Sequence, residues 1–132
     1  MKGLDTNVLV RYLVRDDPHQ AAKASAYILG LAATGESCFI NMIVLCELVW
    51  VLESAYDYRR EEIAKVLRRM LNTKQFEVEE QDLVRQAVDR FATGRGDLAD
   101  YLIGKLNRAG GCDETATFDR SLRKVPDFTL LV

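Results

Sequence analysis

Acidic side chains that directly follow short apolar stretches are the part of this sequence with the clearest chemical potential. Asp5 follows Lys2-Gly3-Leu4, and either Thr6 or Asn7 can cap the helix expected after it. A short strand followed at once by a helix opens a parallel α/β unit, and such sheets bind ligands at the carboxyl ends of their strands. Asp5 alone would also fit a simple cap or turn residue, so its interpretation depends on the other acidic positions.

Glu47 is the second acidic position of interest. It lies in a nearly continuous apolar run from Phe39 to Leu52, in which Asn41 is the other main polar residue. A carboxylate in such a run is costly unless it is paired, protonated or bound to a metal ion, although a backbone amide or an arginine would also satisfy it. Because its helix begins directly after a strand, we expect Glu47 near the same end of the sheet as Asp5.

Asp97 and Asp100 form the third feature. They are three residues apart and therefore share one face of the first turn of a predicted helix. Asp97 fits a helix N-cap at least as well as a metal ligand. Asp100 is harder to explain as a surface residue, because Leu98, Ala99, Leu102 and Ile103 surround it in the sequence. We expect Gly104, one turn further on, to leave room beside Asp100.

Asp119 is the fourth feature and again follows a short strand, with the hydroxyl of Thr117 two residues before it. Taken alone, Asp119 would fit a helix cap.

Four acidic positions at strand ends or early helical turns predict a cluster, and clustered carboxylates repel unless a cation holds them together. Ligands made only of oxygen suit Mg²⁺ or Mn²⁺. Such an ion can activate water and stabilise charge on a phosphodiester under attack.

Other catalytic arrangements find little support. The single histidine, His19, lies in an Asp-Pro turn away from the acidic positions, so neither a Ser/His/Asp nor a Cys/His site is indicated. A receiver-like or phosphatase-like domain would use Asp5 as a phosphoryl acceptor, but a second Asp two residues on and a strand-end Lys are both missing. A phosphate-analogue trap would separate that class from a nuclease.

Short strands separated by helices or helix pairs supply the elements that must position the acids. This pattern predicts an α/β fold with a parallel sheet covered on both faces, in one domain spanning residues 1–132. Strands are expected at 2–4, 37–40, 75–78, 114–117 and 128–132, a helical turn at 119–124, and helices after residue 5 and at 18–33, 42–55, 59–71, 80–92 and 97–109.

Composition limits the remaining classes. A net charge of −2 argues against a protein that holds nucleic acid through overall electrostatic attraction. The three cysteines, Cys38, Cys46 and Cys112, include no Cys-x-x-Cys pair, and we interpret them as reduced, mostly buried side chains. With no secretion leader and no apolar stretch of roughly 18 residues, we expect a cytoplasmic protein without a membrane span.

The motifs also resemble a known family. The segments 5–12, 47–52, 97–100 and 116–119 together resemble the PIN-domain ribonucleases, and especially the VapC toxins of toxin-antitoxin pairs. The resemblance covers essentially the whole chain in order and spacing. It implies a five-stranded parallel sheet in a three-layer α/β/α sandwich and an Mg²⁺- or Mn²⁺-dependent endoribonuclease. It further implies a frequent homodimer and a small antitoxin partner.

Carried over position by position, the resemblance assigns the catalytic acids and metal ligands to Asp5, Glu47, Asp100 and Asp119, with Asp97 as a further acidic ligand. It gives Thr6, Asn7 and Thr117 supporting roles, with the Thr117 hydroxyl near the metal. Two departures concern packing and substrate fit: Tyr101 stands where many relatives have Ala, and Gly96-Asp97-Leu98 replaces a more usual Asp-Phe pair.

Basic side chains near the expected cleft are candidates for RNA phosphates. They are Arg11, Arg15, Arg95, Lys105, Arg108 and Arg120, and each also fits a solvated surface charge. Trp50, Tyr56 and Tyr58 could serve a dimer or antitoxin surface, although ordinary core packing is favoured for Trp50. A catalytically silent RNA- or partner-binding module on the same fold is the alternative function. It predicts metal-independent RNA binding and indifference to Asp100→Asn.

Overall fold

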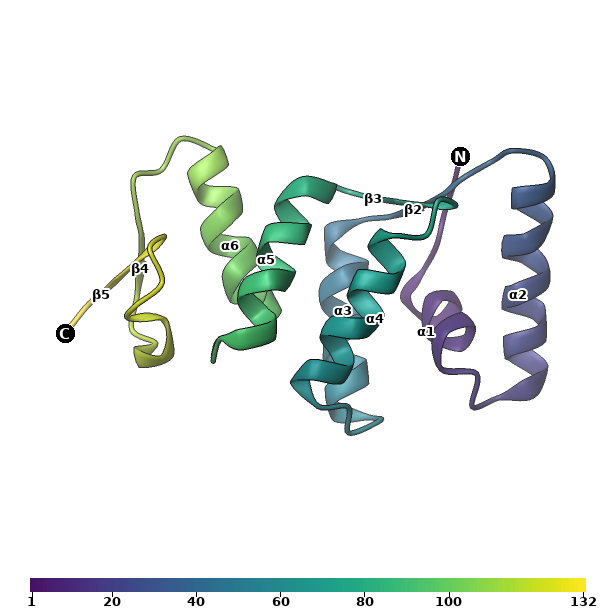
Figure 1. Ribbon diagram of the computed structural model, residues 1–132, viewed down its shortest axis with the longest axis horizontal. Coiled ribbons are helices and arrows are strands. Elements are labelled where there is room, and N and C mark those ends of the chain that lie inside the picture. Colours follow the sequence, from purple (N-terminus) through teal and green to yellow (C-terminus); the bar gives the residue numbers. More distant parts are fainter. The chain divides into compact units, whose positions relative to one another are not determined.

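Six α-helices, five short strands and one 3₁₀ turn make up the computed structural model, which describes residues 1–132 (Figure 1). The chain divides into two compact units, Met1–Gln81 and Asp82–Val132, and each is described by itself. None of the helices is both long and apolar enough to cross a lipid bilayer.

The first unit is built on a three-stranded parallel sheet in the order β1 (Lys2–Gly3), β2 (Cys38–Ile40) and β3 (Phe76–Val78). Lys2 pairs with Cys38, which in turn pairs with Phe76. The side chains of Cys38 and Ile40 in β2, and of Phe76 and Val78 in β3, are buried at alternate positions, as expected when strand side chains point to opposite faces.

Four helices cover this sheet: α1 (Thr6–Val14), α2 (Pro18–Ala33), α3 (Met42–Ser54) and α4 (Arg60–Leu71). Asp17 caps α2 with Pro18 at its first position, and Asn41 caps α3 by accepting a hydrogen bond from the Val44 amide. Helix α1 packs against α2 and α3, and α3 lies beside α4 (Figure 1). Their apolar faces form a core that includes Leu9, Ile28, Leu45, Leu48, Leu52, Ile63 and Leu67.

The second unit contains nearly all of α5 (Gln81–Thr93), followed by α6 (Leu98–Ala109), β4 (Thr115–Thr117), the 3₁₀ turn η1 (Arg120–Leu122) and β5 (Phe128–Leu130). Strands β4 and β5 pair in parallel, with Thr115 opposite Phe128. Apolar side chains of α5, α6 and η1 form the core, among them Val84, Val88, Phe91, Leu98, Tyr101, Leu102 and Leu122.

The α/β class with parallel strands is confirmed, and every expected strand is present. Three of the five strands pair in the first unit and two in the second. Most element boundaries agree with the sequence within one or two residues, and Pro18–Ala33 agrees at both ends.

Three local expectations are wrong. Asp5, and not Thr6 or Asn7, caps α1. Trp50 is 67% exposed and contributes nothing to the core, because it lies on the face of α3 opposite Leu48 and Leu52. Gly104 makes room for Phe128 and not for Asp100: a Cβ atom at residue 104 would lie 2.8 Å from Phe128 Cε2.

The cysteines are all free, as expected, but only Cys38 is fully buried. Cys46 is partly buried, whereas Cys112 follows the Gly110-Gly111 turn and is exposed. Burial raises the pKa of the Cys38 and Cys46 thiols, which keeps both protonated and unreactive near neutral pH.

Candidate functional site

The predicted acidic residues fall into two groups, one in each unit. The first acidic group consists of Asp5 and Glu47 and lies in the first unit. The second acidic group consists of Asp97, Asp100 and Asp119 and lies in the second unit.

Asp5 stands between β1 and α1, where its backbone is extended. Its Oδ1 atom accepts a hydrogen bond of 2.8 Å from the Thr6 amide, so the side chain is fixed at the helix N-terminus. The carboxylate is exposed and lies in the lining of a cavity of about 550 Å³, together with the exposed side chain of Asn7. Asp5 is therefore a cap whose second oxygen remains open to a ligand.

Thr6 connects the two members of the first acidic group. Its hydroxyl, on a side chain only 7% exposed, donates a hydrogen bond of 2.7 Å to Glu47 Oε1. Glu47 projects from α3 and is itself exposed, so the apolar run around it in the sequence does not enclose its carboxylate. The two bonded residues are 41 positions apart in the sequence. The contact therefore holds Glu47 against Thr6, the residue that follows Asp5.

In the second acidic group, Asp97 occupies the N-cap position of α6, as one of its two sequence interpretations predicted. The Asp97 amide donates a hydrogen bond of 3.0 Å to Asp100 Oδ2. Burial raises the pKa of the Asp100 carboxyl; the Asp97 amide opposes this increase, and the negative charges of Asp97 and Asp119 add to it. The three carboxylates therefore interact electrostatically.

Asp119 caps η1. Its Oδ1 atom accepts hydrogen bonds from the Ser121 hydroxyl at 2.7 Å and the Ser121 amide at 2.9 Å, and both lower the pKa of Asp119. The Asp119 amide donates to Thr117 Oγ1 at 3.0 Å. Sequence reasoning missed Ser121, although a serine two residues after a capping Asp is a recognisable local signal.

The donor chemistry of both groups fits a hard divalent cation, because every predicted ligand is a carboxylate oxygen and like charges around Asp100 would be relieved by a positive ion. No group of three or more His, Cys, Asp or Glu side chains with metal-holding geometry occurs in the structure. Each acidic group therefore supplies only part of a ligand set.

Comparison with known proteins identifies the fold family. The PIN domain model matches residues 3–127, which span both acidic groups. The chain belongs to the PIN-domain family. It is also 30% identical over 125 residues to the VapC ribonuclease of Aquifex aeolicus (strain VF5), an alignment that covers 95% of this chain and 92% of the relative. The resemblance seen in the motifs is thereby confirmed.

Two predicted RNA contacts of this PIN-domain protein lie in the first unit and have protein partners. Arg11 donates from Nε to Gln20 at 2.6 Å and from one terminal nitrogen to Asp16 and to the Tyr56 hydroxyl, each at 3.2 Å. Arg15 donates to Ser25 Oγ at 2.8 Å. Arg11 thus joins the end of α1 to the loop after α3.

Lys105 and Arg108, both on α6 of the PIN-domain protein, converge on Asp127. Arg108 Nε lies 2.6 Å from Asp127 Oδ1, and Lys105 Nζ lies 3.7 Å from Oδ2. Asp127 is only 7% exposed, so its charge requires these partners. The two cations therefore hold the segment before β5 against α6.

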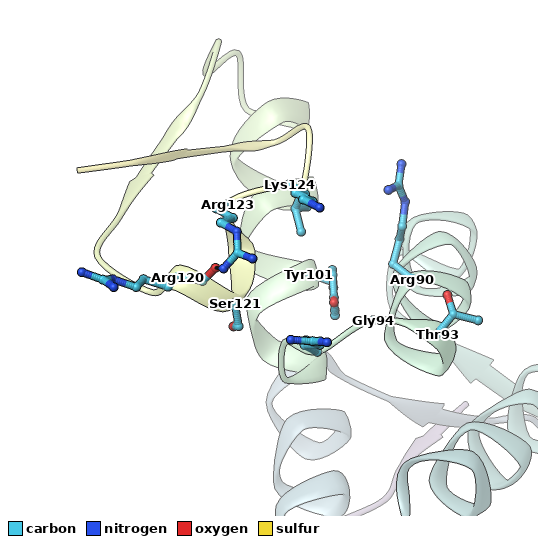
Figure 2. Close-up of a pocket in the computed structure, with 10 residues that line it drawn as sticks. Arg90, Thr93, Gly94, Tyr101, Arg120, Ser121, Arg123 and Lys124 are labelled. Atoms are coloured by element: carbon cyan, nitrogen blue, oxygen red, sulfur yellow. Dashed lines mark hydrogen bonds between the residues drawn. The ribbon is translucent and has the colours of Figure 1, made fainter. Parts of the chain in front are cut away.

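Arg95 and Arg120 line a cavity in the second unit of the PIN-domain protein (Figure 2). Three further cations that sequence reasoning missed line the same cavity: Arg90, Arg123 and Lys124. They were missed because they lie on different elements, the end of α5 and the segment after η1, with no common spacing.

Proposed function

We propose that the protein is an Mg²⁺- or Mn²⁺-dependent endoribonuclease that hydrolyses RNA phosphodiesters, and the toxin of a toxin-antitoxin pair. Membership of the PIN-domain family and the similarity to a VapC ribonuclease over 95% of the chain support this proposal. The observation that carries it is this similarity. Within the second acidic group, burial and two neighbouring carboxylates raise the pKa of the half-buried Asp100. A cation at this position would relieve the repulsion.

In this proposal, one PIN-like domain spans the whole chain, and Asp5, Glu47, Asp100 and Asp119 are the ligands of one or two metal ions, with Asp97 as an additional ligand. When bound, the metal supplies an activated water molecule and stabilises negative charge on the phosphodiester. Five carboxylates match the preference of Mg²⁺ and Mn²⁺ for oxygen ligands.

The neighbouring residues hold these carboxylates in place. Thr6 orients Glu47 through its hydroxyl, and the Asp97 amide orients Asp100. Ser121 fixes one oxygen of Asp119 and leaves the other available. Thr117 holds the backbone of Asp119 and supports its direction. Such positioning keeps ligand atoms in place before the metal and the RNA arrive.

We further propose a small cognate antitoxin, a homodimer and a cytoplasmic location. The similarity to a VapC protein supports the toxin assignment. Ile43 and Trp50 are 73% and 67% exposed and lie seven residues apart on one face of α3, which is consistent with a protein-binding surface. The neighbouring reading frame, where a cognate antitoxin would be encoded, provides the simplest independent check.

The decisive experiment is cleavage of a mixed pool of tRNA and ribosomal RNA with EDTA, Mg²⁺ or Mn²⁺. The wild type is compared with Asp100→Asn, which keeps an oxygen for the Asp97 amide, and with Asp113→Asn, a control that removes an exposed carboxylate outside both acidic groups. We expect metal-dependent cleavage by the wild type and Asp113→Asn, and a loss of at least roughly a hundredfold in Asp100→Asn.

The alternative is a catalytically silent RNA- or partner-binding module on the same fold. The cation-lined cavity of the second unit favours it as the second candidate, because such a cavity could bind RNA without metal. It predicts that all three proteins leave every RNA intact with every metal, and that RNA binding is equal for the wild type and Asp100→Asn.

A further inference from the structure

The cavity in the second unit has a volume of about 530 Å³ and concentrates positive charge. Arg90 comes from the end of α5, and Arg123 and Lys124 come from the segment that follows η1. Figure 2 shows Arg90 on one side of the cavity, Arg123 and Lys124 on the other, and Tyr101 between them. Its volume falls within the range of small-molecule sites and is large enough for one nucleotide.

No acidic side chain lines this cavity. Arg90, Arg123 and Lys124 form no ion pair, and the one hydrogen bond made by the Arg123 side chain is to the backbone oxygen of Arg120 at 3.4 Å. Lys105 and Arg108, by contrast, are both held by Asp127. Cations that line a cavity with no acidic side chain in it are suited to an anionic ligand.

Tyr101 adds a neutral hydrogen-bonding group to the cavity. Its side chain is only 4% exposed, and its hydroxyl oxygen accepts a hydrogen bond of 3.1 Å from the Gly96 amide. This bond uses the hydroxyl oxygen as an acceptor and does not use the hydroxyl proton. Gly94 leaves the space that this hydroxyl occupies, because a Cβ atom at residue 94 would collide with it.

The cavity is also directly connected to the second acidic group. Ser121 lines the cavity and donates two hydrogen bonds to Asp119, while Tyr101 follows Asp100 on α6. An anion held by the cations would therefore lie beside Ser121, which holds the proposed metal ligand Asp119. Phosphate fits this setting best, since arginine binds phosphate oxygens through two parallel N–H groups.

We propose that this cavity is a phosphate subsite that binds a nucleotide of the RNA substrate beside the one that is cut. The inference rests on the proposed ribonuclease function and adds Arg90, Arg123, Lys124 and the Tyr101 hydroxyl to the RNA-binding surface. Arg90 and Arg123, on opposite sides of the cavity, supply cations for the phosphate. The Arg120 side chain points away from the cavity (Figure 2) and contributes less.

The test is binding of a fluorescent single-stranded 12-nucleotide RNA in EDTA, measured by anisotropy over a range of salt concentrations. The pocket variant Arg90→Gln/Arg123→Gln is compared with the wild type. The control variant Lys65→Gln/Arg69→Gln also removes two positive charges, but from exposed positions of α4. Circular dichroism verifies that all three proteins are folded, which is expected because the substituted side chains lie at the surface.

We expect the pocket variant to bind RNA roughly tenfold more weakly. The slope of log K against log salt should become shallower by roughly 0.7, the value for one phosphate contact on a single strand. The control variant should change neither quantity appreciably. Equal affinities and slopes for the two variants, or no binding by the wild type, would overturn the subsite.

These results are independent of the cleavage assay, because EDTA removes any metal. RNA binding that depends on the pocket, together with absence of cleavage in every metal, would retain the subsite and reject the nuclease. Metal-dependent cleavage with identical kinetics in the wild type and the pocket variant would retain the nuclease and reject the subsite. If both proposals are correct, the pocket variant should raise KM and leave kcat within about twofold of the wild type.

Discussion

Thr6 Oγ1 donates a hydrogen bond of 2.7 Å to Glu47 Oε1, and this contact joins the N-terminus of α1 to the middle of α3. The hydroxyl is buried whereas the carboxylate is exposed, so the contact orients Glu47 and leaves its second oxygen available. Because Asp5 immediately precedes Thr6, the bond also fixes the spacing between the two carboxylates of the first acidic group.

Thr6→Val replaces the hydroxyl by a methyl group of similar size and should preserve packing while releasing Glu47. We expect RNA cleavage and Mn²⁺ affinity to fall roughly 10- to 100-fold, as for other residues that orient metal ligands. Thr6→Ser retains the hydroxyl and should restore most of both. Cleavage kinetics and calorimetric Mn²⁺ titration measure the effects, and unchanged values in Thr6→Val would show that Glu47 needs no such support.

Arg108→Gln should weaken folding and leave RNA binding intact. The substitution removes the 2.6 Å ion pair to the nearly buried Asp127, which then keeps only Lys105 at 3.7 Å. We expect a loss of about 1–3 kcal/mol in the free energy of unfolding, measured with urea. Lys124→Gln provides the opposite control, because it removes an unpaired cation of the cavity and should weaken RNA binding without this loss of stability.

Helix positions followed well from the sequence because their signals are local. Asp17 and Pro18 begin α2, and Asn41 begins α3, through contacts within three residues of the cap. The strand that precedes Asp119 was predicted in the same way. A pattern of caps and periodic apolar residues specifies one chain segment at a time, so it also specified where each acidic residue would stand in its own segment.

Partners from distant parts of the sequence could not be predicted in this way. Nothing near Glu47 indicates its bond to Thr6, and nothing near Arg108 indicates Asp127, because these pairs form only after helices pack. The exposure of Trp50 has a related cause. Helix α3 is apolar on nearly all sides, so its sequence does not reveal which face is covered.

The hydrogen bond of 2.8 Å from Tyr56 to Asp16 predicts a dependence of stability on pH. It lowers the pKa of Asp16, and the same bond raises the pKa of Tyr56. The ionised Asp16 therefore stabilises the fold above its unfolded pKa of about 3.9, and this contribution is lost as the pH falls through the lower folded value. The neutral Tyr56 contributes below about pH 10, and this contribution is lost as the pH rises through the higher folded value.

Tyr56→Phe removes both contributions and preserves the ring. We expect the wild type to unfold at a higher urea concentration than Tyr56→Phe near pH 7. The difference should shrink at strongly acidic and strongly alkaline pH, where only the contact between Arg11 and Tyr56 still separates the two proteins. Tyr58→Phe, which changes a neighbouring ring without the Asp16 contact, is the matched control. A difference that stays constant from acid to alkali would assign the effect to packing instead.

Divalent metal should stabilise the folded protein through the second acidic group. Without a cation, burial and the charges of Asp97 and Asp119 disfavour ionised Asp100, and this opposes folding at neutral pH. A metal ion bound only by the folded state removes that repulsion and adds its own binding energy. This energy is about 2.7 kcal/mol when the metal concentration is about 100 times Kd, or roughly 10 °C in Tm.

Mg²⁺ or Mn²⁺ should therefore raise the Tm of the wild type and of Asp113→Asn by this amount. Asp100→Asn should have a higher Tm than the wild type in EDTA and gain little from metal. A wild-type Tm that is unchanged at saturating Mn²⁺ would contradict the proposed metal site, even if the protein cleaves RNA.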